Sequence, residues 1–322
     1  MTQHPPRNLG LDLVRATEAA ALQAGRWMGL GKRNDADQDA TRAMFSVLET
    51  LDMEGYIVVG EEGKLGQTSP LQSGQTVGSR HGPAMDVVID PIDGRNLLAQ
   101  GKPGAISVAA VAPRGSMWSP TPAVYMEKIV VDRRAAHALV PECMDAPVAW
   151  TLALIARVTN RLVRDLIVFV LERRRHADII EEIRAAGARV MLRSDGDIAG
   201  ALMAASVGSG ADILLGVGGV SEGVIAACAV KALGGAMLGR LAPQSAAERA
   251  AVAEAGLDTR RILTCNELIN SNEIFFAATG ITDGPLLKGV HYEGNAAETE
   301  SLILRSETHT RRTIHAEHWI DE

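Results

Sequence analysis

Aromatic residues, cysteines and long apolar runs are all scarce in this sequence of 322 residues. Phe, Trp and Tyr make up 3% of the chain, so aliphatic side chains have to fill the core. The three cysteines are far apart and outside any C-x-x-C pattern, which argues against a disulfide framework and a cysteine zinc site. No run of about 18 apolar residues is present to cross a bilayer, and the first residues lack a signal-peptide core. These absences predict a soluble, cytoplasmic protein that does not bind a membrane.

An excess of basic charge is also missing, because 39 acidic residues outnumber 32 basic ones and give a formal net charge of −7. Nucleic-acid-binding proteins neutralise phosphates with clustered Lys and Arg, so we expect no nucleic-acid partner. Hydrophobic residues make up 47% of the chain and charged residues 22%, which is typical of a folded globular protein. The length is sufficient for two compact units, since domains usually run to about 100–200 residues.

Apolar residues recur at helical spacing over 11–28, and a second helix is predicted over 38–48. Short β-branched runs follow, and we interpret them as the strands of one sheet: 56–59, 87–89, 106–108 and 128–131. The segment from Pro141 to Pro147 loses periodicity and is a candidate domain boundary. The sequence therefore predicts an α+β domain over 1–145 and an α/β domain over 146–322.

The second half of the chain alternates between strands and helices, which is typical of α/β units with parallel strands. The elements expected there are strands at 166–171, 189–192 and 213–217 and helices at 178–186, 198–205 and 222–233. An alanine-rich helix is predicted over 242–255. Later strands are expected at 274–278, 302–304 and 313–314.

The most informative segment is an apolar strand, 86–89, that places Asp90 at its end and Asp93 on the turn that follows. Pro91 and Gly94 are residues that fix such turns. Two carboxylates in this arrangement bind hard cations such as Mg²⁺ or Mn²⁺, and a metal pair suits phosphoryl transfer because it clamps the attacking and leaving oxygens. In isolation, Asp-x-x-Asp-Gly is more typical of an ordinary turn with side-chain hydrogen bonds.

Three further features favour the metal interpretation. A second strand ends in Glu61 and Glu62, and an acidic turn at 34–37 precedes a helix, although each alone is typical of a cap or a loop. The third feature is a buried strand at 213–217 that breaks into glycines and opens a helix. Backbone N–H groups at such a junction can receive a phosphate, and Glu222 can reach a metal. The glycine spacing does not form G-x-G-x-x-G, so dinucleotide binding is the weaker alternative.

These motifs recur in order in a known family. They are Asp90-Pro91-Ile92-Asp93-Gly94, Tyr125-Met126-Glu127-Lys128, Arg175-His176, Asp195-Gly196-Asp197, Gly218-Gly219-x-x-Glu222-Gly223 and Ala278-Thr279-Gly280-Ile281-Thr282-x-Gly284. From about residue 11 to residue 315 the chain resembles the class II fructose-1,6-bisphosphatases, some of which also act on sedoheptulose 1,7-bisphosphate.

The resemblance implies an α/β fold, the layered α-β-α-β-α sandwich of the inositol monophosphatase and fructose bisphosphatase type, which includes the lithium-sensitive phosphatases. It also implies hydrolysis of the 1-phosphate of fructose 1,6-bisphosphate in gluconeogenesis, with Mg²⁺ or Mn²⁺ as cofactor. A homo-oligomer is the default assembly for such an enzyme.

Carried over position by position, the resemblance also implies roles for particular residues. The metal ligands would be Asp37, Glu61, Asp90, Asp93 and Glu222. The substrate contacts would be Asp93, Gly94, Arg95, Tyr125, Arg173, Arg174, Arg175, Asp195, Gly196, Asp197 and Gly219. Such roles suit the residue types, because Arg binds phosphate oxygens bidentately and Asp accepts hydrogen bonds from sugar hydroxyls. The charged run 172–175 would be a solvated face in isolation, but it directly follows an apolar strand, where ligand sites of α/β proteins lie.

Arg95 departs from the family pattern, in which a threonine at this position helps orient the attacking water. A guanidinium only donates hydrogen bonds, so it cannot accept one from that water. We expect Arg95 to neutralise charge on the transferring phosphoryl group and Glu62, itself unusual at its position, to orient the water. The predicted catalytic set is therefore Asp90, Asp93, Glu61, Arg95 and Glu62. Two alternatives stay open: a phosphatase for another phosphomonoester such as an inositol phosphate, and a non-catalytic sugar-phosphate-binding homologue.

Overall fold

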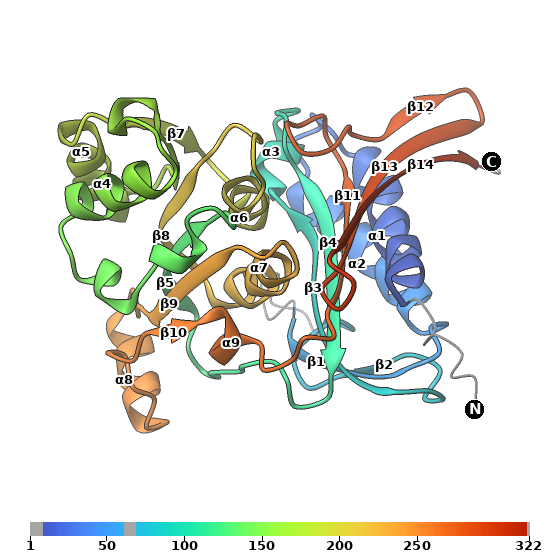
Figure 1. Ribbon diagram of the computed structural model, residues 1–322. Helices are drawn as coiled ribbons and strands as arrows, with labels where there is room; N and C mark the ends of the chain where they lie inside the picture. Colours follow the sequence, from blue (N-terminus) through green and yellow to red (C-terminus); the bar gives the residue numbers. More distant parts are fainter. Residues whose placement is uncertain (1–8, 61–68, 321–322) are drawn as a thin grey trace.

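The computed structural model describes residues 9–60 and 69–320, which form two β-sheets with helices on their outer faces and between them (Figure 1). The first sheet has the strand order β12-β13-β11-β4-β3-β1-β2, with β14 paired to β13. Its strands are β1 (Glu54–Val59), β2 (Thr76–Val77), β3 (Ala84–Asp93), β4 (Ile106–Pro113), β11 (Phe275–Gly280), β12 (His291–Glu293), β13 (Ala296–Arg305) and β14 (Thr310–Trp319). Only β1 and β3 are parallel neighbours in this sheet.

The second sheet has the strand order β10-β9-β5-β8-β6-β7. Its strands are β5 (Tyr125–Val131), β6 (Ile167–Leu171), β7 (Arg189–Arg193), β8 (Ile213–Gly219), β9 (Ala236–Leu241) and β10 (Leu263–Thr264). Strand β6 runs parallel to both β7 and β8, whereas the pairs made by β5 and β9 are antiparallel. The parallel alternation predicted for this half therefore holds only for β6, β7 and β8.

Helices separate and cover the sheets in a regular way (Figure 1). Helices α1 (Leu9–Gly25) and α2 (Arg33–Leu48) pack on the outer face of the first sheet, and α4 (Val148–Val158) and α5 (Ala177–Ala185) on the outer face of the second. Helices α6 (Asp197–Ala205) and α7 (Val220–Ala232) lie between the sheets and contribute to a core shared by both. The short helices are α3 (Arg95–Ala99), α8 (Ala246–Glu254) and α9 (Cys265–Leu268).

The composition of the central elements follows from this layering. Strand β4 is buried along almost its whole length and reads as a continuous apolar run, because helices cover both faces of its sheet. Helix α7 is buried nearly all round and rich in small residues, as expected of a helix held between two sheets. Because these side chains are small, the backbones of neighbouring elements can approach closely, so the core is densely packed with few aromatic residues.

Most of the predicted elements are confirmed, with three corrections. Helix α2 begins at Arg33, so the acidic turn expected at 34–37 is part of this helix, with Asp35 in the first turn, where the helix dipole favours an acid. Strand β5 belongs to the second sheet and not to the sheet of β1, β3 and β4, because a β-branched run specifies a strand but not its partner. Asp93 is the last residue of β3 and does not lie on a following turn. The elements that were not predicted are strands β2, β9, β10 and β12 and helices α3, α4 and α9.

The two sheets do not divide the chain at residue 145, because β5 lies in the second sheet and β11 to β14 return to the first. The division into 1–145 and 146–322 stays a prediction about folding units. Glu61 and Glu62 lie outside the described residues. Within 9–60 and 69–320 no helix has the length and apolarity needed to cross a membrane. All three cysteines are buried free thiols.

Candidate active site

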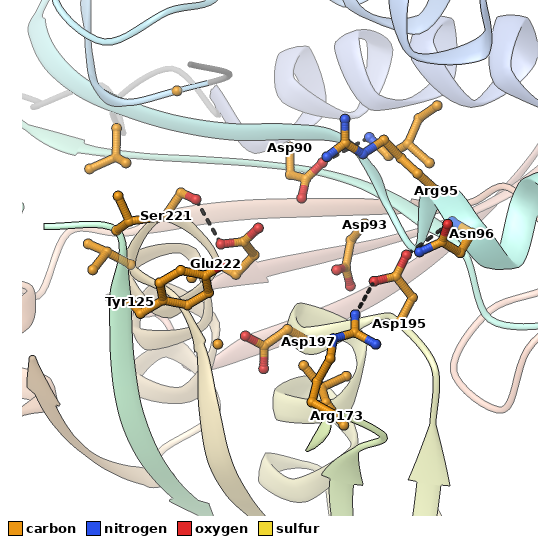
Figure 2. A pocket seen from close by; sticks show the side chains of 18 of the residues that line it. Asp90, Asp93, Arg95, Asn96, Tyr125, Arg173, Asp195, Asp197, Ser221 and Glu222 are labelled. Carbon is orange, nitrogen blue, oxygen red and sulfur yellow. Dashed lines mark hydrogen bonds and ion pairs between the residues drawn. The ribbon is translucent and has the colours of Figure 1, made fainter. Parts of the chain in front are cut away.

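A pocket of about 600 Å³ opens between the two sheets, where β3 and β8 end and α6 and α7 begin. Figure 2 shows its side chains: Asp90 and Arg95 lie on one side, Asp93 and Glu222 in the middle, and Asp195, Asp197 and Arg173 on the other. The pocket therefore collects residues that are far apart in the sequence. Of the residues predicted for the site, those lining it are Asp90, Asp93, Arg95, Tyr125, Arg173, Arg175, Asp195, Asp197, Gly219 and Glu222.

The end of β3 supplies two buried carboxylates. In a regular strand residues three apart point to opposite faces, but the pairing of β3 with β4 shifts register between Asp90 and Asp93. This irregularity allows both side chains to line the pocket. The Asp90 carboxylate accepts a hydrogen bond from the Ile92 N–H at 3.0 Å, and Asp93 accepts one from the Ala199 N–H, in the first turn of α6, at 2.8 Å. Backbone donors from both halves of the chain thus fix the two acids.

The electrostatics of these acids favour a bound cation. Burial, and secondly the negative charge of Asp90, raise the pKa of Asp93 well above its usual value. A positive ion beside the pair would relieve this repulsion and hold both carboxylates ionised. Since their ligand atoms are all oxygen, the chemistry of the donors suits a hard divalent cation.

Glu222 reaches the same part of the pocket from the first turn of α7. The Ser221 hydroxyl donates a hydrogen bond to its carboxylate at 2.8 Å. Gly219 leaves room for this carboxylate, because a Cβ at position 219 would lie 1.8 Å from Glu222 Oε2 and would displace it. Among residues 9–60 and 69–320 no three His, Cys, Asp or Glu side chains are grouped closely enough to hold a metal ion. The predicted ligand Glu61 is not among those residues.

Asp37, the remaining predicted ligand, is buried on α2 and does not line the pocket. Its Oδ1 atom lies 3.4 Å from the Arg95 guanidinium, which lines the pocket with 27% of its side chain exposed. Arg95 begins α3 directly after Gly94, whose φ of 103° is in the left-handed region that favours glycine. Arg95 therefore brings a permanent positive charge to the acid that was predicted to bind a metal.

The opposite wall is basic. The Arg175 guanidinium donates hydrogen bonds to the Val217 carbonyl, at 3.2 and 2.8 Å, and stacks 5.1 Å from the centre of the Tyr125 ring. Arg173 donates to the Ser194 carbonyl at 2.6 Å and pairs with Asp195 at 3.3 Å. Arg174, which is exposed like Arg175, does not line the pocket, so the structure does not bring it to the other predicted substrate contacts.

A buried histidine supports this basic wall. The Val217 N–H donates to Nε2 of His176 at 2.8 Å, so Nδ1 carries the proton and donates to the Leu171 carbonyl at 2.7 Å. Both ring nitrogens are thereby used, and burial lowers the pKa of His176. The neutral imidazole thus ties the loop that carries Arg175 to strand β8.

The loop before α6 links the two walls. Asp195 accepts a hydrogen bond from the Asn96 N–H at 3.0 Å, while Gly196, with φ of 90°, turns the chain so that Asp197 begins the helix. Gly94 and Gly196 therefore shape the pocket without lining it. The pocket also contains polar residues that were not assigned a role from the sequence: Arg33, Asn34, Asn96 and Ser221. Asn96 accepts from Arg33 at 2.7 Å, a contact across 63 residues for which the sequence carries no pattern.

Comparison with known proteins identifies a family that matches nearly the whole chain. A family model described as "Bacterial fructose-1,6-bisphosphatase, glpX-encoded" matches residues 7–318. The chain belongs to this family.

Relatives with assigned names align with the chain over nearly its whole length. A D-fructose 1,6-bisphosphatase class 2/sedoheptulose 1,7-bisphosphatase of Synechococcus sp. (strain JA-3-3Ab) is 37% identical over 338 residues, covering 97% of this chain and 96% of the relative. A fructose-1,6-bisphosphatase class 2 of Haemophilus influenzae (strain ATCC 51907 / DSM 11121 / KW20 / Rd) is 36% identical over 329 residues, covering 98% and 97%. The family membership predicted from the motifs is confirmed.

Proposed function

We propose that this protein is a phosphoric monoester hydrolase that removes the 1-phosphate of fructose 1,6-bisphosphate, and that sedoheptulose 1,7-bisphosphate is a second substrate. The observation that carries the proposal is the pocket itself, in which an acidic wall faces a basic wall. A substrate with a phosphate at each end needs both, because one phosphate has to react and the other has to be held. The names of the relatives point to the same substrates.

The acidic wall is where we place the reaction. Asp90, Asp93 and Glu222 would hold a divalent cation, together with Glu61, and Mg²⁺ and Mn²⁺ are the ions that suit such oxygen donors. A bound divalent cation lowers the pKa of water and draws charge from the phosphoryl oxygens. The hydrogen bonds from the Ile92 and Ala199 N–H groups keep Asp90 and Asp93 in fixed positions, so little rearrangement is needed when substrate arrives.

The basic wall is where we place the phosphate that is not cleaved. Arg173 and Arg175 follow the end of β6, and Arg173 lies on the side of the pocket opposite Asp90 (Figure 2). Their guanidinium groups offer the planar fork that matches phosphate oxygens. Tyr125, stacked against Arg175, is placed to contact the same group. Asp195 and Asp197, between the walls, are proposed to accept hydrogen bonds from sugar hydroxyls.

Arg95 is proposed to act at the reacting phosphate. Its ion pair with Asp37 keeps the guanidinium at the acidic side of the pocket, where negative charge develops on the transferring group. Water orientation then belongs to another acid, for which Glu62 is our candidate. In this arrangement Arg95 supplies a positive charge beside Asp37, the residue for which the resemblance implied metal binding.

The finer description of the fold and assembly is also a proposal. The helix and sheet layers are in keeping with the α-β-α-β-α sandwich of inositol monophosphatases and fructose bisphosphatases. A homo-oligomer is proposed by analogy with most soluble enzymes, which form closed symmetric assemblies.

A metal-supplemented screen of phosphate release tests the function. The purified protein is incubated with Mg²⁺ or Mn²⁺ and with sugar bisphosphates, sugar monophosphates, inositol phosphates and nucleotides in parallel. We expect release from the two sugar bisphosphates to be fastest. Preferential release from an inositol phosphate would keep the chemistry but replace the substrate. No release from any ester, with sugar bisphosphate still bound, would make the protein a non-catalytic homologue.

A further inference from the structure

A lysine is buried directly behind the pocket wall. Lys128, on β5, has 1% of its surface exposed and is one of the largest fully buried side chains among the described residues. Its ammonium group donates a short hydrogen bond to Oδ2 of Asp197. A charged group is stable at such depth only when another charge and hydrogen bonds compensate it. Buried Lys128 therefore needs Asp197 as its partner, unlike a lysine in an ion pair at the surface.

The partner of this lysine faces the substrate pocket. Asp197 lines the pocket, and its carboxylate stands at the first residue of α6 (Figure 2). Lys128 itself does not line the pocket. One end of the ion pair is therefore sealed in the core, whereas the other is presented to the ligand.

The adjacent strand makes room for the pair. A Cβ at Gly218, on β8, would lie 1.8 Å from Asp197 Oδ2 and 2.8 Å from Lys128 Nζ. A residue larger than glycine would therefore displace the Asp197 carboxylate from its present position. The backbone at Gly218 does not have positive φ, so close approach and not conformation is what requires glycine here. Strand β5, strand β8 and helix α6 thus meet at one oxygen atom, Oδ2 of Asp197.

We propose that Lys128 is a positioning residue for sugar recognition: it holds Oδ2 of Asp197, so that Oδ1 remains to accept a hydrogen bond from a hydroxyl of the substrate. An ionised carboxylate only accepts hydrogen bonds, so this site selects a hydroxyl donor and rejects a group that cannot donate. The contact is strengthened because the pair lies in a medium of low dielectric constant. The inference rests on the proposed function, because it assigns the sugar end of that substrate.

Kinetics of Lys128→Met test the proposal, with Lys231→Met as the matched control. Lys231 lies on α7 outside the pocket, where its ammonium donates to the Ile269 carbonyl at 2.8 Å, so the same chemical change is made without touching Asp197. We expect Lys128→Met to lower kcat/KM for fructose 1,6-bisphosphate roughly 10- to 100-fold, mostly through KM, as for loss of a charge-assisted hydrogen bond. Lys231→Met should keep the wild-type value.

Two further arms separate positioning from stability. The first arm uses deoxy analogues of fructose 1,6-bisphosphate, each of which lacks one ring hydroxyl. For the analogue that lacks the hydroxyl recognised by Asp197, the kcat/KM values of wild type and Lys128→Met should be nearly equal. The variant Lys128→Met/Asp197→Asn removes both charges, so it should fold even where the single lysine change does not. Its kcat/KM should match that of Asp197→Asn alone, because Lys128 acts only through Asp197.

A double variant at least tenfold worse than Asp197→Asn would overturn the proposal, since Lys128 would then act independently of Asp197. A Lys128→Met enzyme as active as Lys231→Met would overturn it as well. Either result differs from failure of the proposed function, in which the wild type itself releases no phosphate from any sugar bisphosphate.

Discussion

The acidic and basic walls of the pocket are built in different ways. Asp90 and Asp93 are buried, belong to one strand and accept hydrogen bonds from backbone N–H groups, whereas Arg173 and Arg175 are more exposed and donate to backbone carbonyls. Burial strengthens electrostatic interactions, so charge can be placed against a reacting group on the acidic side. Exposure on the basic side suits a group that has to be bound and released. This contrast supports our proposal that the acidic wall carries the reaction and the basic wall binds the phosphate that is not cleaved.

The largest effect is expected on the acidic wall. Asp90→Asn should lower kcat by about 1000-fold with little loss of fold, because a buried charge beside the reacting group is removed. Asp86→Asn is the matched control: Asp86 is buried on the same strand, but it accepts from the Met117 N–H at 3.0 Å and lies outside the pocket. That variant should lose thermal stability and keep kcat. Equal kcat values for the two variants would contradict the placement of the reaction at Asp90, at the C-terminal end of β3.

The basic wall should respond through binding. Arg173→Ala and Arg175→Ala are each expected to raise KM roughly 10- to 100-fold, with a smaller change in kcat, because each loses charge-assisted hydrogen bonds to a phosphate that does not react. Arg174→Ala, between them in sequence but exposed and outside the pocket, should keep both constants. Steady-state kinetics on fructose 1,6-bisphosphate measure all three. A loss confined to kcat would move the two arginines to the reacting phosphate and remove the contrast between the walls.

Arg95 is an exception to the division into an acidic and a basic wall, because it is a basic residue that pairs with Asp37 at the acidic side. Arg95→Thr removes the positive charge beside a buried carboxylate. We expect a fall in kcat of about tenfold, smaller than for Asp90→Asn, and half-maximal activity at a lower concentration of divalent cation, since Asp37 then attracts the ion instead. A titration of turnover against Mn²⁺ records both. A rise in kcat above wild type would show that Arg95 obstructs the site.

The smallest effect concerns the support of the basic wall. Burial lowers the pKa of His176, with further lowering by the positive charge of Arg175, opposed by the Leu171 hydrogen bond and the charge of Asp197. The unfolded chain therefore binds more protons below about pH 6.5, and the contribution of His176 to stability falls as the pH falls through that value. Thermal unfolding between pH 5 and 8 should lose part of its pH dependence in His176→Gln. The same pH dependence in both proteins would assign it to other groups.

Local features of the fold were readable from the sequence because they depend on neighbouring residues. Apolar runs and helical spacing predicted β3, β4, β8 and α7, and the glycines at the end of β8 predicted the junction at which Glu222 lies. The sheet to which β5 belongs was not readable, since strand pairing is decided by packing between distant segments.

The site was predicted as a set of residues but not as an arrangement. Asp93 meets Ala199 across 106 residues, and Lys128 meets Asp197 across 69, and neither contact has a local signal. Arg174 lies outside the pocket because of the orientation of the short turn that follows β6. The run of charged residues at 172–175 does not specify that orientation. Resemblance supplied the members of the site, whereas packing decided which of them face one another.

The central claim, that the acidic wall carries a metal-dependent hydrolysis of a sugar bisphosphate, is tested most directly by one measurement. The initial rate of phosphate release from fructose 1,6-bisphosphate is measured for chelator-treated wild type before and after addition of Mg²⁺ or Mn²⁺, with Asp90→Asn in parallel. The account predicts no release before addition, full release after it, and almost none from Asp90→Asn under either condition. Full release by the wild type in excess chelator, or restoration of Asp90→Asn to the wild-type rate by metal, would contradict it.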